Sequence, residues 1–133
     1  MPDYDNNILQ YLNGYLEFIS GFNSSLSSDY NYAFGMQEVD EENFELPATR
    51  TPIRFTQFQQ AAAKWFAGEM RDEKWNAAIA DAAENFLEII EIELIRNRPI
   101  QFFMAENDKE SSLFILESET GSFWVEFAKE EKE

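Results

Sequence analysis

The apolar residues in the first third of the chain follow first a helical and then a strand-like spacing. Over residues 6–22 they recur three and four positions apart, which predicts an amphipathic helix with Asp5 as its N-cap. Over residues 30–37 apolar and polar residues alternate, which indicates a strand. Residues 40–43 are then expected to turn the chain into a short return strand over 44–46, a β-hairpin for which a long ordered loop is the alternative.

Two central helices are predicted next. Thr56 and Gln59 fit a capping box, in which the hydroxyl and the amide satisfy each other's backbone N–H groups, and a helix follows to about Met70. A long helix then runs from Glu73 to about Arg96. Apolar residues at helical spacing form its expected core face: Trp75, Ile79, Ala82, Phe86 and Ile90.

The last third of the chain has the pattern of three strands separated by polar turns. The strand-like segments are 100–105, 113–117 and 123–128, which predicts a three-stranded antiparallel meander. Residues 129–133 are all charged and are expected to form a frayed tail. Together with the N-terminal helix, the hairpin and the two central helices, this order of elements predicts an α+β fold.

Length and composition favour a single folded domain over residues 1–133. Hydrophobic residues make up 44% and aromatic residues 16% of the 133 positions, which is enough apolar surface for a core. The chain has no cysteine and no histidine, which excludes disulfides, thiolate nucleophiles, Ser-His-Asp triads and zinc sites of the Cys/His type. We therefore expect neither an enzyme nor a cofactor, and an enzyme that uses carboxylates alone is the weakest hypothesis.

Acidity is the strongest signal in the composition. Asp and Glu number 26 against 10 Lys and Arg, so the formal net charge is −16. This charge repels phosphate backbones and anionic lipids, which argues against direct binding to nucleic acid or to a membrane, and it attracts basic proteins. The first residues lack the basic and apolar regions of a signal peptide, so we expect a cytoplasmic protein of a bacterium or of a phage-infected host cell.

The long central helix carries four acids, hereafter the acidic row: Asp81, Glu84, Glu88 and Glu91. At about 100° per residue they share the face opposite the apolar one, and no Lys or Arg stands between Lys74 and Arg96 to neutralise them. Their rise of roughly 4.5–6 Å along the axis is comparable to the phosphate spacing along a nucleic-acid strand. The row therefore suggests a decoy of nucleic acid, although a solvated helix face is the commoner explanation of a charge run.

A second acidic group lies in the turn expected after the first strand. It comprises Asp40, Glu41 and Glu42, followed by Phe44. Oxygen-rich loops attract Ca²⁺, but this loop lacks the EF-hand spacing, and we expect no metal site. The simplest interpretation is an exposed turn. The functional alternative is a contact loop that grips a basic groove, with Phe44 as its apolar anchor.

The predicted C-terminal meander is apolar on both of its faces. One face must pack on helices, because a sheet buries at least one apolar face against another layer. The other face either lies under the N-terminal helix, which burial of aromatic surface favours, or is an exposed patch for a partner. The aromatic residues assigned to that patch are Phe103, Phe114 and Trp124.

Two functional hypotheses follow from these features. The first is an acidic inhibitor that occludes the basic surface of a nucleic-acid enzyme or complex. Examples are the immunity protein of a nuclease toxin and a phage-encoded anti-defence protein of the anti-CRISPR type that mimics DNA. The second is a small acidic chaperone or assembly adaptor, expected to be a homodimer, which holds an apolar client segment on its aromatic sheet face.

Overall fold

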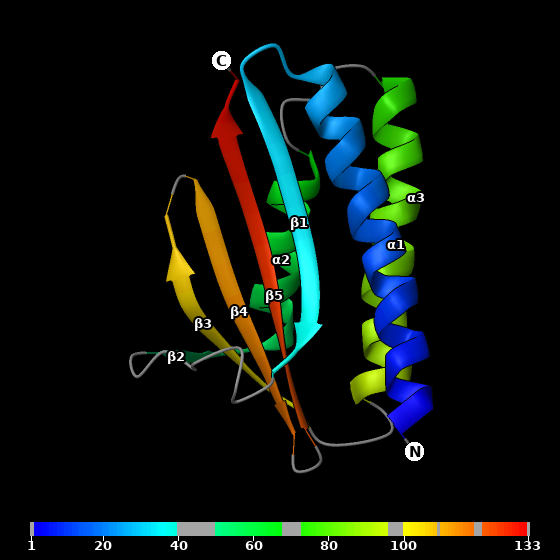
Figure 1. Cartoon of the computed structure of the whole chain (residues 1–133), viewed down its shortest axis with the longest axis vertical. Helices are drawn as coiled ribbons and strands as arrows, with labels where there is room; N and C mark the ends of the chain where they lie inside the picture. Colours follow the sequence, from blue (N-terminus) through cyan, green and yellow to red (C-terminus); the bar gives the residue numbers. More distant parts are fainter. Residues whose placement is uncertain are drawn as a thin grey trace.

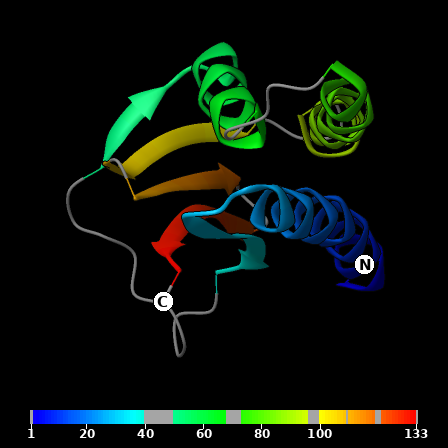
Figure 2. The ribbon, with the colours of Figure 1, turned by 90° about the horizontal axis from the view of Figure 1, so that it is seen from above.

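A computed structural model of the chain shows an α+β fold in which helices cover one face of a five-stranded antiparallel sheet (Figure 1). Seen along the sheet, the helices α1, α2 and α3 lie on the same side of the strands (Figure 2). The structure describes these residues: 2–39, 50–67, 73–95, 100–108, 110–118 and 121–132.

The helices are α1 (Pro2–Leu26), α2 (Phe55–Ala67) and α3 (Glu73–Ile89), and α3 continues into a π-helical segment, η1 (Ile90–Ile95). The predicted core face of the long helix is confirmed for its described side chains, because Ile79, Ala82, Phe86 and Ile90 are all buried. The change to π-helical hydrogen bonding at Ile90 is not visible in the apolar spacing.

The N-terminal helix is longer than its apolar spacing predicts. It begins at Pro2, so Asp5 lies inside the helix and is not its N-cap. At the other end the helix continues through Ser24 and Ser25 to Leu26. Ser24 is accommodated because its hydroxyl donates to the Ser20 carbonyl oxygen at 2.8 Å, one turn back. The helix therefore continues past its last apolar residues and includes these serines.

The strands are β1 (Tyr30–Glu38), β2 (Thr51–Ile53), β3 (Gln101–Asn107), β4 (Ser111–Ser118) and β5 (Gly121–Glu131). Their order in the sheet is β1-β5-β4-β3-β2, and every neighbouring pair is antiparallel. The C-terminal meander is therefore confirmed. The expected turn at 40–43 and return strand at 44–46 lie outside the described residues.

The predicted frayed tail is wrong for the residues that the structure describes. β5 continues to Glu131, which pairs with Tyr30 of β1. Beyond the strand, the Lys132 ammonium donates to the carbonyl oxygens of Ser24 and Ser27 at the end of α1. A cation at a helix C-terminus is favourable, because the last carbonyl groups lack partners within the helix. The charged composition of this segment masks its structural role.

Two local features near α2 were not predicted from the sequence. β2 contains Pro52, and the three-residue strand occupies a sheet edge, where a missing N–H is tolerated. The capping arrangement lies earlier than predicted. The Arg54 N–H donates to Oε1 of Gln57 at 2.8 Å, and the Gln57 N–H donates to the Arg54 carbonyl oxygen at 3.0 Å. The helix therefore starts at Phe55, and Thr56 lies within it.

Aromatic rings fill the core between the sheet and the helices, and we call this set the inner aromatic cluster: Phe34, Phe58, Phe66, Phe114 and Phe127. Phe127 meets Phe34 at 5.3 Å and Phe66 at 5.5 Å between ring centroids, both edge to face. Trp65 stacks on Phe127 and donates its Nε1–H to Oγ of Ser112 at 3.0 Å. Edge-to-face pairs add attraction to the hydrophobic effect of burying these rings.

Helix α1 is fixed along the free edge of β1 by side-chain hydrogen bonds to the strand. Asn13 donates to the Met36 carbonyl oxygen at 2.7 Å and accepts the Met36 N–H at 2.8 Å. Ser24 accepts the Tyr32 N–H at 2.7 Å. These bonds occupy backbone groups that an edge strand otherwise presents to other chains. On its other side α1 packs beside α3, so that the two helices form one face of the molecule (Figure 1).

Candidate functional site

The structure places the acidic row on the exposed side of the long helix. Asp81, Glu84 and Glu88 are exposed on α3, and Glu91 is exposed on η1. The buried residues of the same helix point into the core, so the opposition of acidic and apolar faces agrees with the sequence. Within α3, Asp81, Glu84 and Glu88 rise roughly 4.5–6 Å from one acid to the next, and Glu91 follows in the π-helical segment. The four carboxylates thus form a line on the outer surface.

No described cation neutralises this line of carboxylates. In the part of the chain that the structure describes, the ion pair is the one between Arg50 and Glu117 at 2.9 Å, on the sheet. The described residues Arg54 and Lys64 belong to the start and the end of α2. The negative potential along α3 is therefore available to a partner, although other exposed carboxylates are found on the strands.

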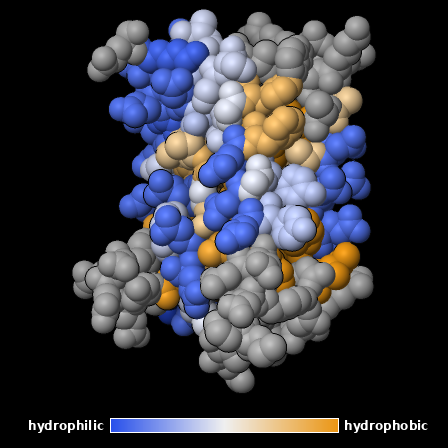
Figure 3. Space-filling view, turned by 45° about the vertical axis from the view of Figure 1, so that its right-hand side comes forward, coloured by the Kyte–Doolittle hydropathy of each residue, from blue (hydrophilic) through white to orange (hydrophobic). Residues whose placement is uncertain are grey.

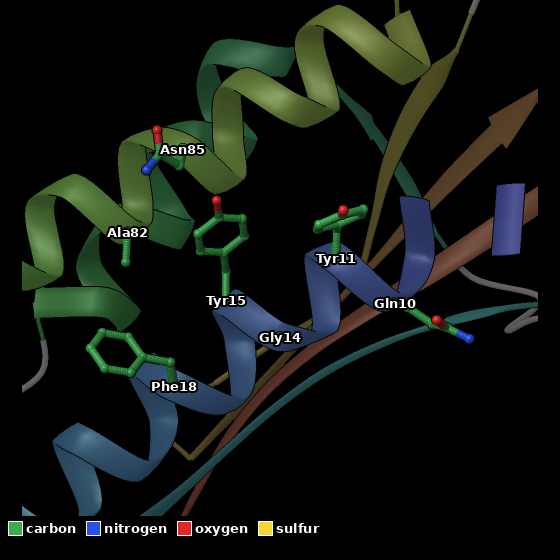
Figure 4. A pocket seen from close by; sticks show the side chains of 7 residues that line it. All are labelled: Gln10, Tyr11, Gly14, Tyr15, Phe18, Ala82 and Asn85. Carbon is green, nitrogen blue, oxygen red and sulfur yellow. The ribbon is translucent and has the colours of Figure 1, made fainter. Parts of the chain in front are cut away.

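A groove of about 920 Å³ runs between α1 and α3, and its described lining contains none of the four acids of the acidic row. Its described lining residues are Gln10, Tyr11, Gly14, Tyr15, Phe18, Ala82 and Asn85. In Figure 4, Tyr15 and Phe18 point from α1 toward α3, and the Tyr15 hydroxyl is directed to Asn85. Tyr11 is 70% exposed and Phe18 is 48% exposed. Large aromatic side chains are therefore open to solvent at this site.

The groove residues of α1 form a second stripe that the sequence analysis missed. Tyr11, Tyr15 and Phe18 are spaced by four and three positions, next to the stripe of Leu12 and Leu16 that is fully buried. The spacing alone was a usable signal, since a helix with apolar residues on two sides contacts something on each of them. Figure 3 shows hydrophobic residues in the upper half of the α1–α3 face, bordered by hydrophilic ones.

The outer face of the sheet, which is opposite the helices, differs from the patch expected there. Phe114 pairs with Val125 and faces the helices, where it is 1% exposed, so its assignment to the outer patch is wrong. Phe103 and Trp124 do lie on the outer face, on either side of Ile115, and both are partly buried. Strict alternation along β4 puts Ile115, not Phe114, on their side.

The coverage of this outer face also differs from the expectation. α1 packs on the helix side of the sheet and along β1, so the N-terminal helix does not cover the outer face. Instead, the Arg50 guanidinium lies 4.5 Å from the centre of the Phe103 ring and pairs with Glu117. A cation over an aromatic face is attracted to the ring. Phe103 thus already has a partner within the chain.

A second groove of about 770 Å³ lies between α2 and the β2–β3 edge. Its described lining includes Ile53, Met104 and Trp65, with Gln60 and Lys64 also contributing from α2. This groove has a basic and amide-bearing border instead of a row of acids. It is therefore less suited than the α1–α3 groove to receive a basic partner.

The remaining features to consider are the acidic loop, metal binding and membrane-spanning helices. The acidic loop residues Asp40, Glu41, Glu42 and Phe44 lie outside the described residues. Within the described part of the chain, no group of three or more acids is placed to hold a metal ion. None of the described helices is long and apolar enough to cross a membrane.

One carboxylate with a shifted pKa lies in the turn between β3 and β4, away from the acidic row. The pKa of Asp108 is lowered from its usual 3.8, because the carboxylate accepts the backbone N–H groups of Glu110 at 2.8 Å and Ser111 at 2.9 Å. Hydrogen bonds to the charged form favour it. Asp108 is fully exposed and serves to close the turn.

The function of this surface has to be inferred from its own residues. The sequence matches no known protein family and no curated protein. Exposure, charge and shape single out the α1–α3 face, where four exposed acids without an ion pair to any described cation share the long helix with an open aromatic groove.

Proposed function

We propose that this protein is an inhibitor that binds and occludes the basic, nucleic-acid-binding surface of a partner protein in the cytoplasm. The observation that carries the proposal is the row of four exposed carboxylates along the long helix, whose residues Ala82 and Asn85 also line the aromatic groove. The partner is a nucleic-acid-processing enzyme or complex, such as a nuclease toxin or a defence nuclease. The protein then acts as an immunity protein or as a phage-encoded anti-defence protein of the anti-CRISPR type.

The mechanism is competition for positive charge. The partner uses Lys and Arg to contact phosphates, and the acidic row offers carboxylates to the same side chains at a spacing comparable to that of phosphates. The net charge of −16 accelerates encounter with such a surface. Apolar contacts in the groove then slow dissociation. No covalent step and no cofactor enters this mechanism.

The adaptor hypothesis has less support than the inhibitor. It used Phe103, Phe114 and Trp124 as one aromatic surface, but Phe114 belongs to the core and Phe103 is paired with Arg50. The more open aromatic side chains, Tyr11 and Phe18, lie on α1 instead. An apolar client would therefore meet the α1–α3 groove, which is the same surface that the inhibitor uses.

Charge reversal on two faces tests the proposal. The test variant is Glu84→Lys with Glu88→Lys on α3, and the matched control is Glu126→Lys with Glu130→Lys on β5. Both pairs change the net charge equally, and all four residues are exposed. Binding to candidate basic nucleases, and to proteins recovered from lysate of the source cells, is measured across salt concentrations.

We expect affinity to fall steeply with added salt and to drop on the order of tenfold or more in the α3 variant only. Bound protein should also displace nucleic acid from the partner. The proposal is wrong if affinity is independent of salt, or if the β5 variant loses as much affinity as the α3 variant.

A further inference from the structure

The α1–α3 groove is open, and aromatic side chains of α1 line one side of it. We propose that it receives the apolar side of a basic amphipathic α-helix presented by the partner protein. This inference rests on the proposed function and specifies which part of the partner is bound.

The length of the stripe fits the repeat of a helix. Tyr11 and Phe18 are seven residues apart on α1, and Tyr15 lies between them, so the stripe extends roughly 10.5 Å along the axis. A bound helix offers apolar side chains at positions i, i+3 or i+4, and i+7 over the same length. A groove of about 920 Å³ is large enough for several such side chains.

Charge complementarity identifies the occupant as basic. On α3, Asp81 and Glu88 lie one helical turn before and one after the groove residue Asn85, whereas the described groove lining itself contains neither a basic nor an acidic residue. A helix with Lys and Arg beside its apolar side therefore meets carboxylates as its apolar residues enter the groove. A second copy of this chain is disfavoured, because each copy carries a net charge of −16.

Gly14 leaves space in the groove that a larger residue would fill. It lies inside α1, where glycine costs about 1 kcal/mol relative to alanine. A Cβ atom added at Gly14 would meet no heavy atom within 4 Å. Gly21 has equally open surroundings two turns further along α1, but it does not line the groove. The two positions give a matched pair for blocking the groove without disturbing the core.

The experiment uses two labelled peptides of about 18 residues, or five helical turns. In the first, leucines follow the i, i+3, i+4, i+7 pattern and the other residues are lysine and glutamine. The second has the same composition with the leucines scattered around the helix. Fluorescence anisotropy measures the binding of both to the wild type, to Gly14→Leu and to Gly21→Leu, and circular dichroism confirms that both variants are folded.

We expect the wild type and Gly21→Leu to bind the amphipathic peptide about tenfold more tightly than the scattered one, and Gly14→Leu to lose this preference. Equal binding of both peptides to the wild type would mean that charge alone acts, and it would overturn the inference. An unchanged preference in Gly14→Leu would overturn it as well.

The two proposals fail in different ways. If Glu84→Lys with Glu88→Lys lowers the affinity for the natural partner while Gly14→Leu does not, the proposed inhibitor function is supported. The proposal that the groove holds a helix of the partner is then wrong. If reversal of these acids leaves the natural partner bound at every salt concentration, the proposed function itself is wrong.

Discussion

Two sets of aromatic residues in this protein have similar chemistry and opposite surroundings. The inner aromatic cluster is enclosed between the sheet and the helices, and its rings contact one another edge to face at 5.3–6.1 Å. The outer stripe of Tyr11, Tyr15 and Phe18 lines an open groove on α1, where two of its three members are among the most exposed large apolar residues described.

The difference shows which aromatic residues folding requires. Burial of the inner cluster removes a large apolar area from water, and this is the main favourable contribution to folding. Tyr11 at 70% exposure contributes little of this kind. An exposed apolar patch with a charged border is characteristic of an interaction surface. We therefore attribute the outer stripe to binding and the inner cluster to stability.

The largest effect on stability is expected from Phe127→Ala. Phe127 is fully buried and contacts the rings of Phe34, Phe66 and Phe114. Loss of the ring and the resulting cavity should lower the free energy of unfolding by about 3–5 kcal/mol. Urea denaturation of the variant and the wild type measures this change. A loss below about 1 kcal/mol would show that the inner cluster does not hold the fold together.

A smaller loss is expected from Asn13→Ala, which tests how α1 is fixed. The side chain forms two hydrogen bonds to the backbone of Met36, at 2.7 and 2.8 Å. Removing it should cost about 1–3 kcal/mol in unfolding free energy, because two groups of the edge strand lose their partner. Asn13→Asp keeps the acceptor only, so it should lie between alanine and the wild type. Equal stability of Asn13→Ala and the wild type would contradict this role.

Tyr11→Ala is expected to leave stability nearly unchanged and to impair binding. The residue is 70% exposed, so its removal should change the free energy of unfolding by no more than about 0.5 kcal/mol. Binding of the amphipathic peptide should weaken, because the groove loses one of its aromatic lining side chains. Thermal unfolding and anisotropy on the same sample separate the two effects. A variant that unfolds, or that binds as well as the wild type, would remove the distinction between the two aromatic sets.

The smallest effect concerns the turn at Asp108, which lies in neither aromatic set. Its folded pKa is below the usual 3.8, so its contribution to stability is present above that pH and is lost as pH falls through the lowered pKa. An NMR titration should show the amide signals of Glu110 and Ser111 changing with a midpoint below 3.8. The change should be absent in Asp108→Asn. A midpoint at or above 3.8 would contradict the hydrogen-bonded turn.

The spacing of apolar residues along the chain correctly predicted the C-terminal meander and the core side of α3. It failed where a partner distant in the sequence decides the structure. The strand β2, which contains Pro52, was not predicted, because pairing with β3 at the sheet edge is what makes these residues a strand. The charged residues after Ala128 indicated a loose tail, yet pairing with β1 extends β5.

The candidate site was predicted in part for the same physical reason. The acidic row follows from helical periodicity alone, and the structure leaves it exposed on one side of the helix. The groove depends on α1 lying beside α3, a contact that arises because both helices pack on the same core. No local pattern contains that information. Phe114 shows that alternation has to be applied to every strand before residues are grouped by face.

The most direct test of the central claim is zero-length carbodiimide cross-linking of the protein to its captured partner. This reagent joins a carboxylate to a lysine amine only where the two groups are in contact, and mass spectrometry of the peptides identifies both residues. We predict cross-links to partner lysines that also contact nucleic acid, and we expect them to arise from the acidic row: Asp81, Glu84, Glu88 and Glu91. Cross-links that arise instead from Glu106, Glu126 and Glu130 on the strands would contradict it.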